Sequence, residues 1–300
     1  MLQNIKKYKF VFAIVFSSII LYFLFNKYDA KDIYSRVNEL DKSYFVGYIL
    51  LFVPQLIIAG RRWKYIMDNI NNNPLSIYRS FQMCIASYSA NLVIPGKMGE
   101  VVRVLWIDKE KSKYPNLFLI LFEKVFDLLS VFIIFYVSLM LSIKEGDLYF
   151  NIFLYTNFFM GFIVIIGVLV KLLKINFLGK KINFIISFFR DNNRKIAVVF
   201  LYSIVLWLVQ IMQFYLLFRS FNLEIAPILV FAGASLSVLS GAVIFSIGGI
   251  GPRDATLLYF FRNLVPEVTL LSIGILTALR ILIPAFIGLP FLINLSRRNE

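Results

Sequence analysis

The stretch NLVIPGKMGE, residues 91–100, decides the fold, because it interrupts an apolar region that runs from about residue 80 to 112. Proline lacks a backbone donor and glycine has a low helix propensity, so a straight helix through this stretch would lose hydrogen bonds. A second apolar region, about 226–264, is interrupted in the same way by SIGGIGPRD, residues 246–254. We therefore expect two broken helical regions, whose tips contain Pro95, Gly96, Gly99, Gly248, Gly249 and Gly251.

Six uninterrupted apolar segments accompany these two regions, at about 10–26, 44–60, 116–143, 149–171, 197–218 and 268–294. A segment of roughly 18 or more apolar residues can cross a bilayer, and it must be helical to satisfy its own backbone hydrogen bonds. The 300-residue chain is 60% hydrophobic and 16% charged, which excludes a soluble enzyme and an outer-membrane barrel. No small-residue cleavage site follows the first segment, so we expect an uncleaved span.

The net charge of +14 is interpreted as a topology signal rather than as a sign of nucleic-acid binding. Positive residues gather at the N-terminus, after the second segment, before residue 197 and at the C-terminus. Cytoplasmic segments of membrane proteins carry such an excess. Six crossings from a cytoplasmic N-terminus place every positive cluster inside, provided that each interrupted region returns to its own side. This predicts a multi-pass protein of the cytoplasmic (inner) membrane with both termini in the cytoplasm.

The same count divides the single transmembrane domain, residues 1–300, into two halves, 1–145 and 146–300. Each half has the pattern span, span, hairpin, span, and three crossings place the second half in the opposite orientation. The tips also align, PGKMG at 95–99 with IGGIG at 247–251, and paired interruptions in inverted halves are typical of transporter sites. We predict an all-α polytopic membrane protein with six spanning helices and two re-entrant hairpins in an inverted repeat. Eight full spans are the alternative.

Two carboxylates lie within an otherwise apolar span. Glu123 and Asp127 are four residues apart, so they share one helix face. A carboxylate at membrane depth must be paired or face water, and that face is expected to point into the protein. A proton relay, a contact to a cation or headgroup, and a structural ion pair to Arg103 or Lys124 all remain open.

Further charges follow the two tips. Glu100 and Arg103 come after the first tip, and Arg253 and Asp254 come after the second. A helix N-terminus with an arginine is suited to a phosphate or headgroup, although capping and hairpin closure would need the same residues. Arg280 is a lone cation in the last span and requires a partner there, either a carboxylate of the other half or a lipid phosphate.

Other residues are given structural interpretations. Arg61, Arg62 and Trp63 end the second span and are expected to anchor it at the membrane interface. Cys84 is expected to be an inert packed thiol. The chain has no histidine, one cysteine and no phosphate-binding loop, so no metal ion or cofactor is expected.

Several motifs resemble those of a known family. Residues 91–103 resemble the pattern N-x-x-x-P-G-x-x-G-E-x-x-R, and residues 123–127 resemble E-R-x-x-D with Lys124 replacing arginine. Arg62 and Trp63 resemble the family's RW after its second span. Residues 247–254 resemble its late P-G-G-x-G-x-x-E, with isoleucine in place of the first proline and aspartate in place of the final glutamate. Together they resemble the lysylphosphatidylglycerol synthase transmembrane-region family, which is also called flippase-like.

The resemblance implies an inner-membrane flippase or translocase that moves a phospholipid or a lipid-linked substrate between leaflets. It implies substrate-binding roles for Asn91, Glu100, Arg103, Glu123, Asp127, Arg253, Asp254 and Arg280. Larger relatives carry a cytosolic aminoacyl-transfer domain, and that activity is not expected of a chain ending soon after its last span. Alternatives are an intramembrane enzyme that uses Glu100, Glu123 and Asp127 as acid–base groups or Mg²⁺ ligands, and an accessory partner of an envelope-biosynthesis enzyme.

Overall fold

The computed structural model describes residues 30–92, 94–108, 110, 112–142, 150–157, 179–242 and 251–297. Regular structure within these ranges is helical, without a strand. The predicted first span at 10–26, most of the span at 149–171, and two tip residues, Gly248 and Gly249, lie outside the described residues. Residues 150–157, at the start of that fourth span, are helical.

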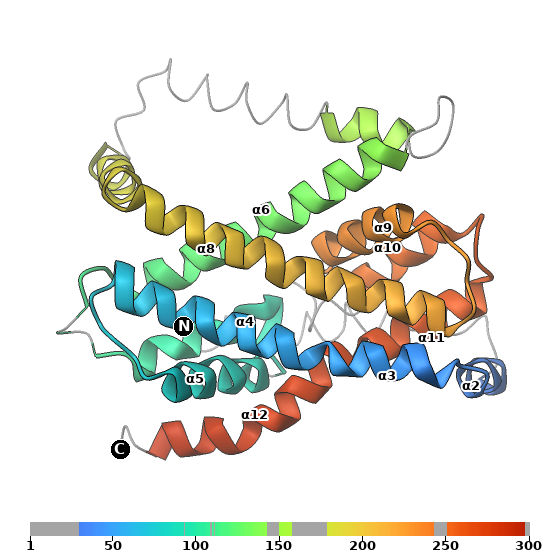
Figure 1. Ribbon diagram of the computed structural model, residues 1–300, viewed down its shortest axis with the longest axis horizontal. Helices are drawn as coiled ribbons and strands as arrows, with labels where there is room; N and C mark the ends of the chain where they lie inside the picture. Colours follow the sequence, from blue (N-terminus) through green and yellow to red (C-terminus); the bar gives the residue numbers. More distant parts are fainter. Residues whose placement is uncertain are drawn as a thin grey trace, which may run out of the picture.

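Figure 1 shows the helices of the described residues. In chain order they are α2 (Ala30–Asn38), α3 (Lys42–Leu50), α4 (Phe52–Tyr65), the π-helical turn η1 (Ile66–Ile70), α5 (Ile77–Ala90), the 3-10 helix η2 (Pro95–Trp106), α6 (Asn116–Ser142), α8 (Gly179–Ser220), α9 (Pro227–Ser240), α10 (Pro252–Phe261), α11 (Glu267–Thr277) and α12 (Leu279–Arg297).

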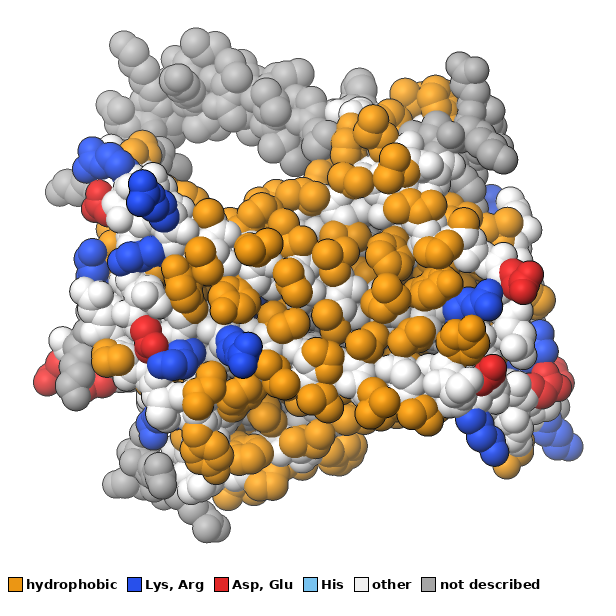
Figure 2. All heavy atoms as spheres, in the orientation of Figure 1, with side chains coloured by type: hydrophobic (Ala, Val, Ile, Leu, Met, Phe, Trp, Pro, Cys, Tyr) orange, Lys and Arg blue, Asp and Glu red, His pale blue; other side chains and the backbone are white. Residues whose placement is uncertain are grey.

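Three helical segments are long and apolar enough to cross a membrane, namely Lys42–Ile70, Asn183–Ser220 and Glu267–Leu295. The predicted spans at 44–60, 197–218 and 268–294 lie inside them. The predicted span at 116–143 coincides with α6, whose 27 residues extend for about 40 Å at 1.5 Å per residue. Figure 2 shows apolar side chains across the middle of one face and charged side chains towards its two ends, as expected for a membrane protein.

Both interrupted regions are broken where the sequence predicts. In the first, α5 ends at Ala90 and the chain continues as the tighter helix η2, which begins at Pro95. In the second, α9 ends at Ser240 and α10 begins at Pro252. The residue before α10 is Gly251, whose φ of 96° lies in a region that favours glycine.

The packing links the two halves reciprocally. The last helix of the second half, α12, packs against α5, and the last helix of the first half, α6, packs against α9. Helices α3 and α4 pack along α8, so these three helices also join the halves. In Figure 1, α5 and η2 lie towards one end of the molecule, whereas α9 and α10 lie towards the other.

The contact between α5 and α12 depends on small residues. Ser89 of α5 donates a hydrogen bond from Oγ to the backbone oxygen of Ala285 in α12, at 2.6 Å. Gly288 is buried one turn further along, and a Cβ atom there would collide with the backbone oxygen of Ile85 and with the Ser89 hydroxyl. Helices in lipid associate through this kind of close packing, because the membrane supplies little hydrophobic force between them.

Candidate functional site

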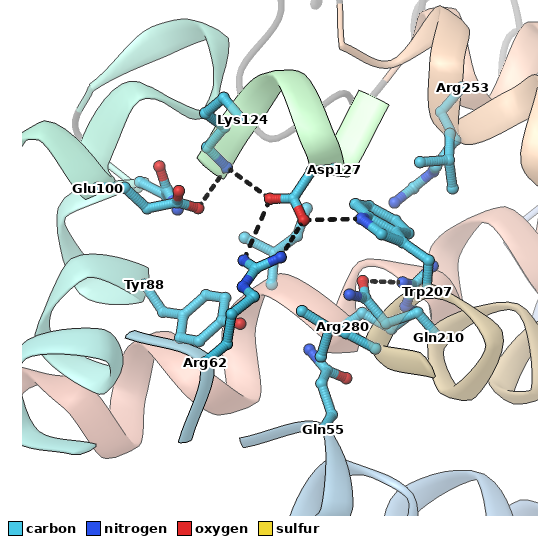
Figure 3. Close-up of a pocket in the computed structure, with 14 residues that line it drawn as sticks. Gln55, Arg62, Tyr88, Glu100, Lys124, Asp127, Trp207, Gln210, Arg253 and Arg280 are labelled. Atoms are coloured by element: carbon cyan, nitrogen blue, oxygen red, sulfur yellow. Dashed lines mark hydrogen bonds and ion pairs between the residues drawn. The ribbon is translucent and has the colours of Figure 1, made fainter. Parts of the chain in front are cut away.

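A cavity of about 120 Å³ lies where elements of both halves meet (Figure 3). The first half contributes side chains from α4, α5, η2 and α6, and the second half contributes side chains from α8, α9, α10 and α12. The charged residues that line the cavity are Arg62, Glu100, Lys124, Asp127, Arg253 and Arg280. Such a group of charges among apolar helices is costly unless it is paired or faces water, which makes the cavity the candidate site.

Arg62 is the centre of the charged group. Its Nη2 lies 2.6 Å from Glu123 Oε1 and its Nη1 lies 2.5 Å from Asp127 Oδ1. Nη1 also donates to the Ser203 hydroxyl at 2.8 Å, and the whole side chain is only 4% exposed. One guanidinium therefore holds both carboxylates of α6 and ties α4 to α8, as Figure 3 shows for Asp127.

The prediction that Arg62 and Trp63 anchor the span at the interface is wrong. Both side chains are buried, and only Arg61 is exposed. The helix continues beyond them into η1, so they face the protein rather than the membrane boundary. The Trp63 ring lies under the Arg103 guanidinium, with 4.3 Å from Arg103 Cζ to the ring centroid.

Arg103 and Lys124 complete the group. Arg103 Nη2 lies 2.8 Å from Glu123 Oε2 and 3.1 Å from Glu100 Oε2. Lys124 Nζ lies 2.5 Å from Glu100 Oε1 and 3.9 Å from Asp127 Oδ2. We call these six side chains the ion-pair network: Arg62, Glu100, Arg103, Glu123, Lys124 and Asp127.

The network confirms that Glu123 and Asp127 share a face that points into the protein. Both are buried, and Asp127 Oδ1 also accepts a hydrogen bond from Trp207 Nε1 at 3.1 Å. Glu123 has the ion pair to Arg103 that the sequence offered as one alternative, but its closer partner is Arg62. Arg103 itself is only 2% exposed and does not line the cavity, so the structure places it behind the site.

Arg253 and Asp254 serve first to build the start of α10. Arg253 Nε donates to Asp254 Oδ1 at 2.9 Å, and its Nη2 donates to the Gly274 backbone oxygen at 3.1 Å. Asp254 Oδ2 accepts from the Gly251 backbone N–H at 3.1 Å. The capping alternative thus describes Asp254, while Arg253 also reaches the cavity wall.

Arg280 faces the cavity from α12 and has neutral partners. Its Nη2 donates to Gln210 Oε1 at 2.6 Å, and its Cζ lies 4.7 Å from the centroid of the Phe214 ring. Within the part of the chain that the structure describes, no carboxylate pairs with it, and its Nε has no hydrogen-bond partner. The partner that the sequence required for this lone cation is therefore an amide and a ring rather than an acid.

Asn91 holds the first tip closed. Its Oδ1 accepts a hydrogen bond from the Gly99 backbone N–H at 2.7 Å, and a Cβ atom on Gly99 would collide with the chain at Ala90 and Asn91. Asn91 also lines the cavity. Pro95 and Gly96 lie in the first turn of η2.

We expect Asn91→Leu to lower the free energy of unfolding by about 1–2 kcal/mol, because it leaves a buried backbone N–H unpaired. Asn91→Asp keeps the acceptor oxygen and is the matched control. Thermal unfolding of the purified protein in detergent measures both, and equal stabilities for the two variants would contradict this role of the Asn91 side chain.

Sequence reasoning missed the neutral polar residues of the site, namely Gln55, Tyr88, Trp207 and Gln210. Each lies in a predicted apolar segment and carries no charge that sets it apart there. A glutamine inside a predicted span is a signal that could have found two of them. Cys84 is buried, as expected of a packed thiol. Among the described residues, no group of three or more His, Cys, Asp or Glu could hold a metal ion.

Comparison with known proteins identifies the family but no individual relative. The family model described as "Lysylphosphatidylglycerol synthase TM region" matches residues 10–288, which is most of the chain. Comparisons with curated proteins and with solved structures gave no match. The motifs at residues 91–103 and 123–127 supply the ion-pair network together with Arg62, and Asn91 of the first motif accepts the hydrogen bond from Gly99. This protein is therefore a membrane protein that belongs to the lysylphosphatidylglycerol synthase TM region family.

Proposed function

We propose that this protein moves a phospholipid or a lipid-linked substrate between the leaflets of the cytoplasmic membrane, with the headgroup passing through the charged cavity. The single observation that carries the proposal is the cavity itself, because it brings cations from both halves together with carboxylates of the first half among membrane-spanning helices. Intramembrane charges that face a cavity mark substrate pathways. Membrane lipids are the proposed partners, and the lipid leaves chemically unchanged.

The reciprocal packing supports an inverted repeat. Each half provides its last helix to the hairpin region of the other half, α6 to α9 and α12 to α5. If the two halves rock against each other about the α4–α8 contact, the cavity between them opens to one leaflet and then to the other. In this mechanism the interrupted regions are re-entrant and both termini lie in the cytoplasm, as the positive residues predict.

An enzyme acting on a lipid phosphate is the weaker alternative. Its acid–base groups would be Glu100, Glu123 and Asp127, each of which is held by at least one arginine or lysine. Those cations occupy the carboxylate oxygens that an acid–base group or a Mg²⁺ ligand would have to offer. A covalently changed lipid after incubation with the purified protein would favour the enzyme over the translocase.

Filling the cavity tests the translocase directly. Leu206 on α8 is buried and lines the cavity, so Leu206→Trp is expected to abolish lipid movement by occupying the space that the headgroup needs. A fluorescent phospholipid is placed in proteoliposomes, and a membrane-impermeant quencher is added. The measurement is the fraction of the fluorescence that the quencher removes, which rises when lipid moves from the inner to the outer leaflet. Leu208→Trp is the matched control, because Leu208 lies two residues along and is 40% exposed. Full activity of both variants, or none in the wild type, would contradict the proposal.

A further inference from the structure

We propose that the cavity selects a phosphodiester with one negative charge and an uncharged, hydroxyl-bearing headgroup, and that Arg280 is the residue that binds its phosphate. The sequence could not distinguish a cationic headgroup from an anionic one. The inference rests on the proposed function in one respect: the phosphodiester belongs to a lipid only if the cavity transports lipids.

The charges around the cavity do not sum to zero. In the ion-pair network, three carboxylates meet three cations, and each carboxylate contacts at least one of those cations within 3.1 Å. At the start of α10, Arg253 is paired with Asp254 at 2.8 Å. Arg280 then remains as one positive charge without a carboxylate among the residues that the structure describes. The site as a whole therefore carries an excess of one positive charge.

A single half-buried cation among apolar helices calls for a single anion. A charge in a low-dielectric site is costly unless an opposite charge accompanies it, and Gln210 and Phe214 supply only partial charges to Arg280. An arginine is also the side chain best suited to a phosphate, because its planar guanidinium presents several donors. A phosphodiester carries one negative charge and would neutralise the site.

A second, independent observation concerns the headgroup. Gln55 of α4 lines the cavity and is 2% exposed, yet its Oε1 has no hydrogen-bond partner among the described residues. A buried acceptor without a donor is destabilising, because it has lost its hydrogen bonds to water. A headgroup hydroxyl would supply that donor without adding charge. Figure 3 shows Gln55 and Arg280 on the same side of the cavity, where one headgroup can reach both.

An ammonium group on the headgroup is disfavoured by the same charge count. Every carboxylate that lines the cavity already has a cationic partner, Glu100 through Lys124 and Asp127 through Arg62. A zwitterionic lipid would therefore leave the excess charge uncompensated. It would also place its ammonium between Arg253, Arg280 and Lys124, all of which face the cavity.

The test compares soluble short-chain lipids on the purified full chain in a neutral detergent, by calorimetric titration. The probes are dihexanoyl phosphatidylglycerol, dihexanoyl phosphatidylethanolamine and dimethyl phosphate, which is a phosphodiester without a lipid tail. We expect the phosphatidylglycerol to bind at least tenfold more tightly than the phosphatidylethanolamine. Equal binding, or tighter binding of the zwitterion, overturns the inference on the wild-type protein alone, without a variant.

Variants then assign the phosphate to Arg280. Arg280→Gln is expected to weaken phosphatidylglycerol binding at least tenfold, while the melting temperature of the ligand-free protein stays equal or rises, because an unpaired charge is removed. Arg262→Gln is the matched control, since Arg262 is exposed and lies over the Tyr259 ring at 4.8 Å, as Arg280 lies over Phe214, but outside the cavity. Unchanged binding in Arg280→Gln overturns the assignment.

The outcomes separate this inference from the translocase proposal. Dimethyl phosphate that binds as tightly as phosphatidylglycerol, and fails in Arg280→Gln, supports the phosphate site and contradicts a lipid ligand. Selective, Arg280-dependent binding of phosphatidylglycerol without any movement in proteoliposomes supports the inference and contradicts the translocase. Movement of both lipids at equal rates, unaffected by Arg280→Gln, supports the translocase and contradicts the inference.

Discussion

Arg62→Met is expected to lower the free energy of unfolding by about 3–5 kcal/mol, the cost of removing one partner from a buried ion pair. Arg62 is the only group that contacts Glu123 and Asp127 together within 3 Å in the described structure. Without it, two carboxylates remain among apolar helices, with Arg103, Lys124 and Trp207 as their remaining partners. The measurement is thermal unfolding in detergent, followed by the fraction of protein that stays monodisperse.

Arg61→Met is the matched control, because the neighbouring arginine is exposed, and its effect is expected to stay within about 0.5 kcal/mol. A rescue variant strengthens the test. Arg62→Met combined with Glu123→Gln and Asp127→Asn removes the unpaired charges and is expected to recover most of the lost stability. Equal stability of the Arg61 and Arg62 variants would contradict the central place of Arg62 in the network.

The rescue variant also addresses the alternative that the sequence left open. If the stable triple variant still moves lipid, Glu123 and Asp127 act only as structural ion pairs. If it is stable but inactive, the charges of Glu123 and Asp127 take part in transport. They would then act as a proton relay, or they would bind and release Arg62 during the transport cycle. Stability and transport are measured on the same preparation, so the two roles are separated.

Hydropathy predicted three of the six spans, which the described structure contains as long apolar helical segments, because membrane insertion depends mainly on local composition. The segments at 44–60, 197–218 and 268–294 lie within these helical segments, and the segment at 116–143 coincides with α6, which is described up to Ser142. Hydropathy could not predict that α8 begins as early as Gly179, because residues 179–196 are mixed in polarity. A kink at Asn192, where φ is −124° and ψ is 17°, separates this first part of α8 from the part that forms the span. The breaks at Pro95 and Pro252 were predictable, since proline and glycine act locally on the backbone.

For the charged side chains of the site, the contact partners were less predictable than the positions in the chain. The sequence placed Glu123 and Asp127 on one interior face, because helical spacing is local. It could not place Arg62 opposite them, because that contact joins residues that are 65 positions apart and depends on how α4 packs against α6. Likewise, the glutamines that face the cavity carry no charge to distinguish them from other polar residues. The excess charge at Arg280 likewise follows only from the three-dimensional structure, because there every other cation of the site is paired with a carboxylate.

Two glycine-to-alanine substitutions, which are expected to change the free energy of unfolding in different directions, test the packing that joins the halves. Gly288→Ala is expected to lower the free energy of unfolding by about 2–3 kcal/mol, because the new methyl group meets backbone of α5 that cannot move aside. Gly47→Ala, in α3, is expected to leave stability unchanged or to raise it by up to about 1 kcal/mol, since alanine favours a helix and its Cβ meets only the Leu216 side chain, at 3.4 Å.

Both substitutions raise the helix propensity, so a difference in stability between the two variants reports the contact between α5 and α12. Thermal unfolding gives the stabilities, and lipid movement in proteoliposomes gives the functional consequence. Because α12 carries Arg280 and α5 carries Tyr88 into the same cavity, a shift of α12 away from α5 should reduce transport by more than the loss of folded protein explains. A Gly288→Ala protein as stable as Gly47→Ala would show that α5 and α12 are not in the close contact from which the cavity is built.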